Sequence, residues 1–147
     1  MAPIVSLILV SAILQAPASP PAEMGPREAI FSAADAAPIA VSGVFVMRVR
    51  AGGRDRGRAF LNSELDYRDQ RNLTVRIEPE ALAQFEADLG MAPEHFFLGK
   101  LIRVRGPARR ERIDFVERGG RRTDLYYYQT QVRVSRPDQI EVLASAS

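Results

Sequence analysis

The pattern of apolar and polar positions changes its period near residue 38 of this 147-residue chain. Upstream of that point, apolar residues such as Ala29, Ile30 and Ala33 recur at helical spacing. Pro26 suits the first turn of such a helix, and Pro38 ends it. Downstream, apolar and polar residues alternate, which is typical of strands with one buried face. The chain is therefore predicted to be a short helix followed by a mainly β domain.

Seven segments of the downstream region have strand character, and one has helix character. The helix is expected over 80–90, because Leu82, Phe85 and Leu89 share one face. The strands are expected near residues 41–50, 58–62, 73–77, 99–106, 111–116, 125–134 and 138–143. The inward members of the alternating runs form the predicted core: Phe45, Met47, Leu73, Val75, Ile77, Phe85, Ile102 and Val104.

Length and composition fit one globular domain, with 46% apolar and 26% charged residues. Of the 20 basic residues, 19 are arginines and the other is Lys100, yet the formal net charge is only +2. A protein that coats nucleic acid without specificity carries a larger surplus of positive charge. Any site for a polyanion is therefore expected to be local.

The residues that the chain lacks exclude several kinds of catalytic and metal site. It has no cysteine, which rules out disulfides, thiolate zinc sites and thiol nucleophiles. His95 is the only histidine, so a Ser-His-Asp triad would have to use it. Its neighbours Pro93 and Phe96 favour a surface or half-buried histidine instead. The sequence thus predicts a protein that is not an enzyme and has no cofactor and no metal site.

An apolar run from Ile4 to Leu14 precedes Ala16 and Ala18, the small-x-small arrangement of a signal-peptidase site. Three segments follow from this interpretation: a signal peptide at 1–18, a linker with the short helix at 19–38, and the β domain at 39–147. The run is too short to cross a bilayer, so no stable membrane span is expected after cleavage. The protein is then exported, to the periplasm or the exterior. The alternative is an N-terminal helix packed on the domain, because no Lys or Arg precedes Ile4.

Three stretches of the β region share their order with a known family. RAFLNSELDYRDQRNLTVRI (58–77), GKLIRVRG (99–106) and RPDQIEVL (136–143) resemble segments of bacterial nucleic-acid-binding-like OB (oligonucleotide/oligosaccharide-binding) domains, which often accompany exported nucleases. The resemblance covers about Val41 to Leu143. It implies a five-stranded Greek-key barrel with one helix between strands three and four. The chain departs from the pattern in its longer hairpin between strands four and five, and it has no nuclease domain.

The OB resemblance makes the outer barrel face the first candidate site, because such faces bind oligonucleotides. The arginines expected to point outward from the first three strands are Arg48, Arg50, Arg58 and Arg76. Arginine matches phosphate with a two-pronged fork and stacks on bases. The alternative is a solvated face on which Glu64 and Glu78 pair with these arginines.

The second candidate site is the long hairpin, whose turn contains Gly119 and Gly120. It combines arginines with stackable rings, as single-strand binders do. Alternation places Tyr126 and Tyr128 on one side and Tyr127 on the other. Its basic residues are Arg109, Arg110, Arg112, Arg118, Arg121 and Arg122, and Glu111, Asp114, Glu117 and Asp124 offset much of their charge. The predicted ligand-binding residues of both sites are Arg48, Arg50, Arg58, Arg76, Arg109, Arg110, Arg121, Arg122, Tyr126 and Tyr128.

The loop after the second strand carries oxygen-bearing side chains that could suggest a calcium site. These are Asn62, Ser63, Glu64, Asp66 and Asp69. The spacing and the glycine of an EF-hand are missing, and Arg68 and Arg71 lie among the acids. The loop is instead predicted to be a turn held by side-chain hydrogen bonds and arginine–carboxylate pairs.

Two hypotheses for the function remain. The first is an exported OB-like domain that binds single-stranded nucleic acid or another polyanion. The second is a cell-envelope module that binds or assembles with a protein, a glycan or a small ligand, and export favours it because little nucleic acid persists outside the cell. A continuous positive surface from Arg48 and Arg76 to the hairpin would favour the first hypothesis, and interleaved ion pairs would favour the second.

Overall fold

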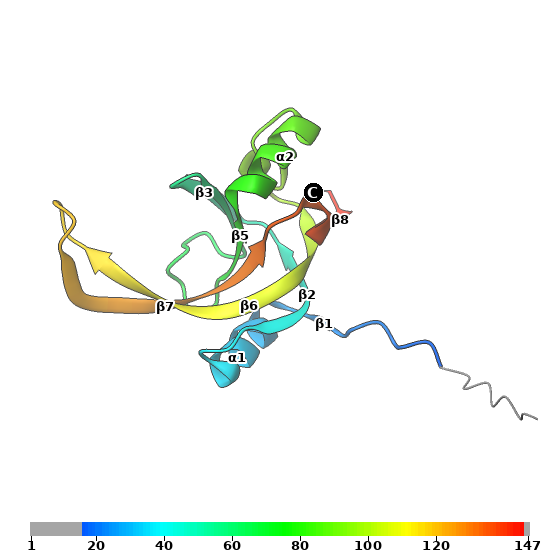
Figure 1. Ribbon diagram of the computed structural model, residues 1–147, viewed down its shortest axis with the longest axis horizontal. Helices are drawn as coiled ribbons and strands as arrows, with labels where there is room; N and C mark the ends of the chain where they lie inside the picture. The colour runs from blue at the N-terminus through cyan, green and yellow to red at the C-terminus, as the bar shows by residue number, and fades with distance from the viewer. Residues whose placement is uncertain (1–15, 146–147) are drawn as a thin grey trace, which may run out of the picture.

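The computed structural model describes residues 16–145 of the chain, and a mixed sheet forms most of this part (Figure 1). The strands are β1 (Glu23–Met24), β2 (Val41–Arg48), β3 (Ala51–Asp55), β4 (Arg58–Asn62), β5 (Leu73–Ile77), β6 (Leu101–Val116), β7 (Arg122–Val134) and β8 (Ile140–Ala144). The helices are α1 (Pro26–Ala36), α2 (Pro79–Leu89), α3 (Pro93–Phe96) and the 3-10 helix η1 (Pro137–Gln139). A mainly β fold with a short N-terminal helix is therefore confirmed. Residues 1–15 of the expected signal peptide lie outside the described residues.

The eight strands follow the order β1-β2-β6-β7-β5-β4-β3, and β8 pairs with β6. The pairs β1–β2 and β5–β7 are parallel, and the other pairs are antiparallel. Between β5 and β6 the chain forms α2, where Pro79 opens the helix and Gly90 closes it with a left-handed φ of 67°. The helix predicted over 80–90 is confirmed.

The sheet is open and has eight strands, which corrects the prediction of a closed five-stranded barrel. The segment from 51 to 57, expected to be a turn, instead forms β3, and the turn narrows to Arg56 and Gly57. Between β2 and β3 the backbone changes partners. The Val49 N–H donates to the Lys100 carbonyl and the Arg50 N–H donates to the Asn62 carbonyl. One continuous stretch of chain therefore supplies strands near both ends of the sheet.

The core lies between the concave face of the sheet and α2. All eight predicted core residues are buried, with exposed fractions of 5% or less. Phe85 on α2 packs edge-to-face against Phe97, with ring centroids 5.6 Å apart. Thr74, a polar member of the alternating run in β5, is fully buried, and its hydroxyl is satisfied by hydrogen bonds with Asn62 and Asn72.

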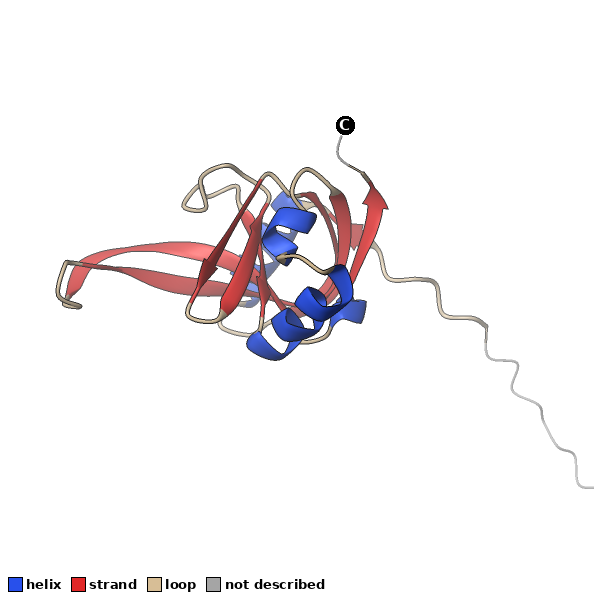
Figure 2. Ribbon diagram, turned by 90° about the horizontal axis from the view of Figure 1, so that it is seen from above, coloured by secondary structure: helices blue, strands red, loops and turns tan. Residues whose placement is uncertain are grey.

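The strands β6 and β7 extend beyond the rest of the sheet as a two-stranded ribbon (Figures 1 and 2). Pairing of β2 with β6 stops at Ala108, and pairing of β5 with β7 starts at Thr130. Within the described chain, residues 111–116 and 122–129 thus have strand partners only in each other. The segments predicted at 99–106 and 111–116 form one 16-residue strand, because the alternation continues through Gly106 without a break.

Candidate ligand-binding groove

A groove of about 860 Å³ lies between α1, the root of the ribbon and the loop that joins β4 to β5. Its size falls within the range of small-molecule and cofactor sites. The residues that line it are Pro26, Arg27, Ile30, Phe31, Ala34, Glu64, Gln70, Arg71, Arg110, Tyr126, Tyr127, Tyr128 and Thr130. We call it the α1 groove.

The helix α1 forms one wall of the groove because its small residues let it approach the sheet. Ala29 and Ala33 are fully buried against the core side. With these alanines facing the core, Arg27 and Phe31 line the groove, and Phe31 remains 58% exposed. They lie one helical turn apart, and the Arg27 guanidinium lies 5.6 Å from the Phe31 ring centroid.

The opposite wall is a stack of arginines and tyrosines from β6 and β7. The Arg110 guanidinium lies 3.6 Å from the centroid of Tyr128, and that of Arg112 lies 4.0 Å from the centroid of Tyr126. The two tyrosine rings meet edge-to-face at 5.6 Å. Cross-strand register explains this arrangement. Arg112 lies directly opposite Tyr128, so Arg110 is the diagonal neighbour of Tyr128 and Arg112 is the diagonal neighbour of Tyr126.

The loop at residues 63–72 closes the groove at its end, and Asn72 holds the loop in shape. The buried Asn72 amide donates to the Tyr67 carbonyl and to Thr74 Oγ1, while its Oδ1 accepts from the Glu64 N–H. Asp69 accepts hydrogen bonds from the Arg71 side chain and backbone, which lower its pKa to about 2. These contacts confirm the turn predicted in place of a calcium site.

The α1 groove differs from the rest of the surface in its free cations. Across residues 16–145, the arginines without a carboxylate partner are Arg27, Arg48, Arg110 and Arg118. Two of these four, Arg27 and Arg110, line the groove. A cation without a protein counter-ion has its hydrogen-bond donors available to an anionic ligand.

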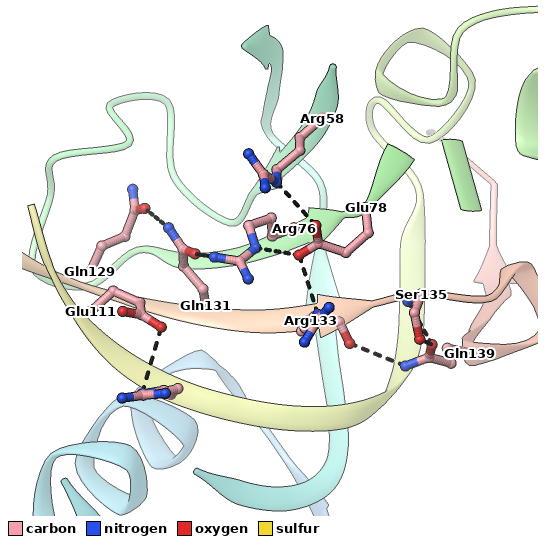
Figure 3. Close-up of polar contacts among 10 residues, drawn as sticks. Arg58, Arg76, Glu78, Glu111, Gln129, Gln131, Arg133, Ser135 and Gln139 are labelled. Carbon is pink, nitrogen blue, oxygen red and sulfur yellow. Dashed lines mark hydrogen bonds and ion pairs between the residues drawn. The ribbon is translucent and has the colours of Figure 1, made fainter. Parts of the chain in front are cut away.

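Two arginines of the predicted outer-face site, Arg58 and Arg76, belong to an ion-pair network centred on Glu78 (Figure 3). The Glu78 side chain is only 6% exposed and pairs with Arg58 at 3.0 Å, Arg76 at 2.8 Å and Arg133 at 3.3 Å. Arg76 also donates to Gln131 at 3.0 Å. Burial by itself would raise the pKa of the Glu78 carboxyl, but the hydrogen bonds and charges of Arg58 and Arg76 outweigh burial and hold this pKa below its ordinary value. Arg58, Arg76 and Arg133 therefore make their ionic contacts within the protein.

The other predicted site residues are dispersed. Arg48 donates to the Gly99 carbonyl at 2.7 Å. The remaining arginines form ion pairs: Arg50 with Glu64, Arg109 with Glu111, Arg121 with Glu117, and Arg122 with Asp114. Of the ten predicted ligand-binding residues, the α1 groove therefore brings together only Arg110, Tyr126 and Tyr128.

The groove also contains Arg27, Phe31 and Arg71, which the sequence pattern did not single out. The i, i+4 spacing of Arg27 and Phe31 on the predicted helix was an available signal, because a cation and a ring at this spacing face the same way. Arg71 could not be found in this manner, since its place depends on the folded loop.

Within residues 16–145 no group of three or more His, Asp or Glu side chains is arranged to hold a metal ion. No helix in the same part of the chain is long and apolar enough to cross a membrane.

Comparisons with known proteins do not assign the chain to a family. No protein-family model matches it, and no curated protein is similar enough in sequence to match. Among the solved structures with a similar chain path is one of a Leishmania major Friedlin protein described as an aspartyl-tRNA synthetase, with 11% identity and a TM-score of 0.46. The alignment covers 93% of this chain and 24% of the Leishmania chain, so this chain spans about a quarter of the length of the Leishmania chain. A likeness at this level identifies neither a family nor a function.

Proposed function

We propose that this protein is an exported, non-enzymatic, OB-like domain that binds a short stretch of single-stranded nucleic acid in the α1 groove. The OB-like interpretation is supported by the path of the chain, in which two residues join β2 to β3 although these strands lie near opposite ends of the sheet order. A sheet arranged in this way curls toward a barrel. Export is supported by the apolar run from Ile4 to Leu14 and the alanines after it.

One observation carries the ligand assignment: Arg110 lies over Tyr128 without a carboxylate partner, in a wall of the α1 groove. A guanidinium held over a ring offers a planar surface to a base and N–H donors to a phosphate. Arg27 and Phe31 repeat the same combination on the facing wall. Two such pairs across one groove suit a chain that alternates flat bases with negative phosphates.

The test is binding of a short fluorescent single strand at low salt, measured by anisotropy. Replacing Arg110 with Ala is expected to weaken binding about tenfold, because one stacked base contact contributes roughly 1 to 3 kcal/mol. Arg118→Ala is the matched control, since Arg118 is also free of ion pairs but lies in the hairpin turn outside the groove. Equal losses in the two variants would show that the α1 groove is not the site.

A second candidate is an envelope module that holds a protein segment, a glycan or a small aromatic anion in the same groove. The ion pairs that occupy the outer-face arginines favour it, because they remove the extended positive surface that a long polyanion needs. Wild-type protein that binds no single strand at low salt and micromolar concentration would replace the first candidate with this one.

A further inference from the structure

In the described structure the ribbon has two edges without a strand partner, one on β6 beyond Ala108 and one on β7 before Thr130. One edge of β6 pairs with β2 up to Ala108 and then has no neighbour through Val116 in the described structure, while the other edge pairs with β7. A two-stranded ribbon is marginally stable by itself, and three or more strands are normally needed. The ribbon also leaves Phe115 39% exposed and Val116 55% exposed.

We propose that the chain forms a symmetric dimer in which residues 110–116 of β6 pair antiparallel with the same residues of a second copy. A two-fold axis perpendicular to the sheet brings residues of the same face together, so residues of equal parity must lie opposite each other. With Ile113 on the axis, Arg112 lies opposite Asp114 of the second copy, and Arg110 lies opposite its Val116. The pairing uses only positions of β6 beyond Ala108, where the pairing with β2 ends.

Charge selects this register among its neighbours. With Ile113 central, Arg112 and Asp114 of the two copies form a square in which each charge has opposite charges beside it and across from it. Moving the axis to Arg112 or to Asp114 would place two like charges directly opposite each other, which destabilises a sheet. Charged edge residues ordinarily discourage strand pairing, but here their order is complementary to itself.

The existing contacts of these side chains allow the new ones. Arg112 pairs with Asp114 of its own strand at 2.9 Å, and the arginine side chain is 56% exposed. An exposed pair of this kind contributes little to stability, so a second partner for each charge adds to it without loss. On the other face, Ile113 would meet its own counterpart, beside the Phe115 ring that already contacts Tyr127 with centroids 5.5 Å apart.

Complementary charge reversals test the dimer and its register together. In the purified protein, Arg112→Glu and Asp114→Arg should each weaken dimerisation roughly tenfold in sedimentation experiments, because symmetry places each like-charge pair twice in the interface. Mixing the two variants should restore a dimer, since the carboxylate introduced at position 112 of one chain then faces the guanidinium introduced at position 114 of the other. A role confined to one chain would not be rescued by mixing.

The matched control is Asp124→Arg, which makes the same charge change on β7, away from the proposed edge. It should dimerise as the wild type does, and circular dichroism should show that every variant is folded. A wild type that is monomeric at high concentration overturns the proposal, and so does a dimer that survives both single reversals. Asp114 does not line the α1 groove, so the Asp114→Arg variant tests the dimer without changing a groove residue, and the dimer and the proposed function can fail independently.

Discussion

Gly106 shows how a single residue allows the end of the sheet to form. The Gln139 amide donates to the carbonyls of Arg105 and Arg133, at 2.8 and 3.1 Å, and so ties β6 to β7. Figure 3 shows the contact with Arg133. Its Oε1 accepts from the N–H groups of Ser135 and Arg136. A Cβ on Gly106 would lie 2.8 Å from the Arg133 carbonyl oxygen and 2.9 Å from the Gln139 amide nitrogen. Only glycine at position 106 leaves room for these contacts of Gln139 with β6 and β7.

Replacing Gly106 with Ala should therefore lower the free energy of unfolding by about 2 kcal/mol, because backbone atoms must shift to remove the overlap. Urea denaturation followed by circular dichroism measures the change. Gly53→Ala is the control, since Gly53 also lies in a strand and a Cβ there meets nothing within 4 Å. Similar losses in both variants would contradict the steric explanation.

At the scale of elements, Glu78 joins three strands through one carboxylate. Its partners Arg58, Arg76 and Arg133 come from β4, β5 and β7, and Glu78 itself lies between β5 and α2. The carboxylate is buried, so loss of its charge would leave three arginines around a neutral group. Since the folded state lowers the pKa of Glu78, its contribution is present above the ordinary value of 4.5 and is lost as the pH falls through the folded value.

The Glu78→Gln variant should be less stable than the wild type at neutral pH by about 2 kcal/mol, between the values typical of exposed and of buried pairs. This difference should shrink as the pH falls below about 4.5, because the wild-type carboxyl then becomes neutral as well. Denaturation curves over a pH series test both statements. Asp55→Asn is the control, because it makes the same kind of change at an exposed ion pair, where little stability should be lost at neutral pH. A constant difference between E78Q and the wild type across the series would exclude the charge as the cause.

For the whole molecule, the distribution of ion pairs matters more than the number of arginines. Most arginines are neutralised by a carboxylate that lies close in sequence or on a neighbouring strand, as for Arg71 with Asp69 and Arg103 with Glu141. The net charge of the protein is therefore only +2, and the α1 groove contains Arg27 and Arg110, two of the four arginines without a carboxylate partner. Few phosphates can be neutralised at once.

Binding of single strands should therefore depend only weakly on salt. Neutralising two phosphates predicts a slope of about −1.4 for the logarithm of affinity against the logarithm of salt, at about 0.7 per phosphate. Anisotropy titrations at several salt concentrations measure this slope. Arg76→Ala should leave the slope unchanged and lower stability instead, because Arg76 bonds to Glu78 and Gln131 inside the fold. A steep slope that flattens in R76A would restore the outer face as the binding surface.

The sequence by itself determined the core and most of the elements, but not β1, β3 or α3. Period-two alternation placed Phe45, Met47 and Val75 inside, and the i, i+3, i+7 pattern located α2, because burial of one face is a local property of a strand or helix. The spacing of Asp66 with Arg68 and of Asp69 with Arg71 also identified the loop at 63–72 as a turn held by side-chain hydrogen bonds.

Only the tertiary structure decided which arginines are free. Arg76 and Arg110 look alike in the sequence, as arginines on alternating strands, but Arg76 meets Glu78 and Arg110 meets Tyr128. Arg76 reaches Glu78 two residues further along the chain, whereas Arg110 reaches Tyr128 through the pairing of β6 with β7, which joins residues far apart in the chain. The order of the strands was decided in the same way, because the change of partners between Val49 and Arg50 is a relation between strands and leaves no trace in the alternation of either one.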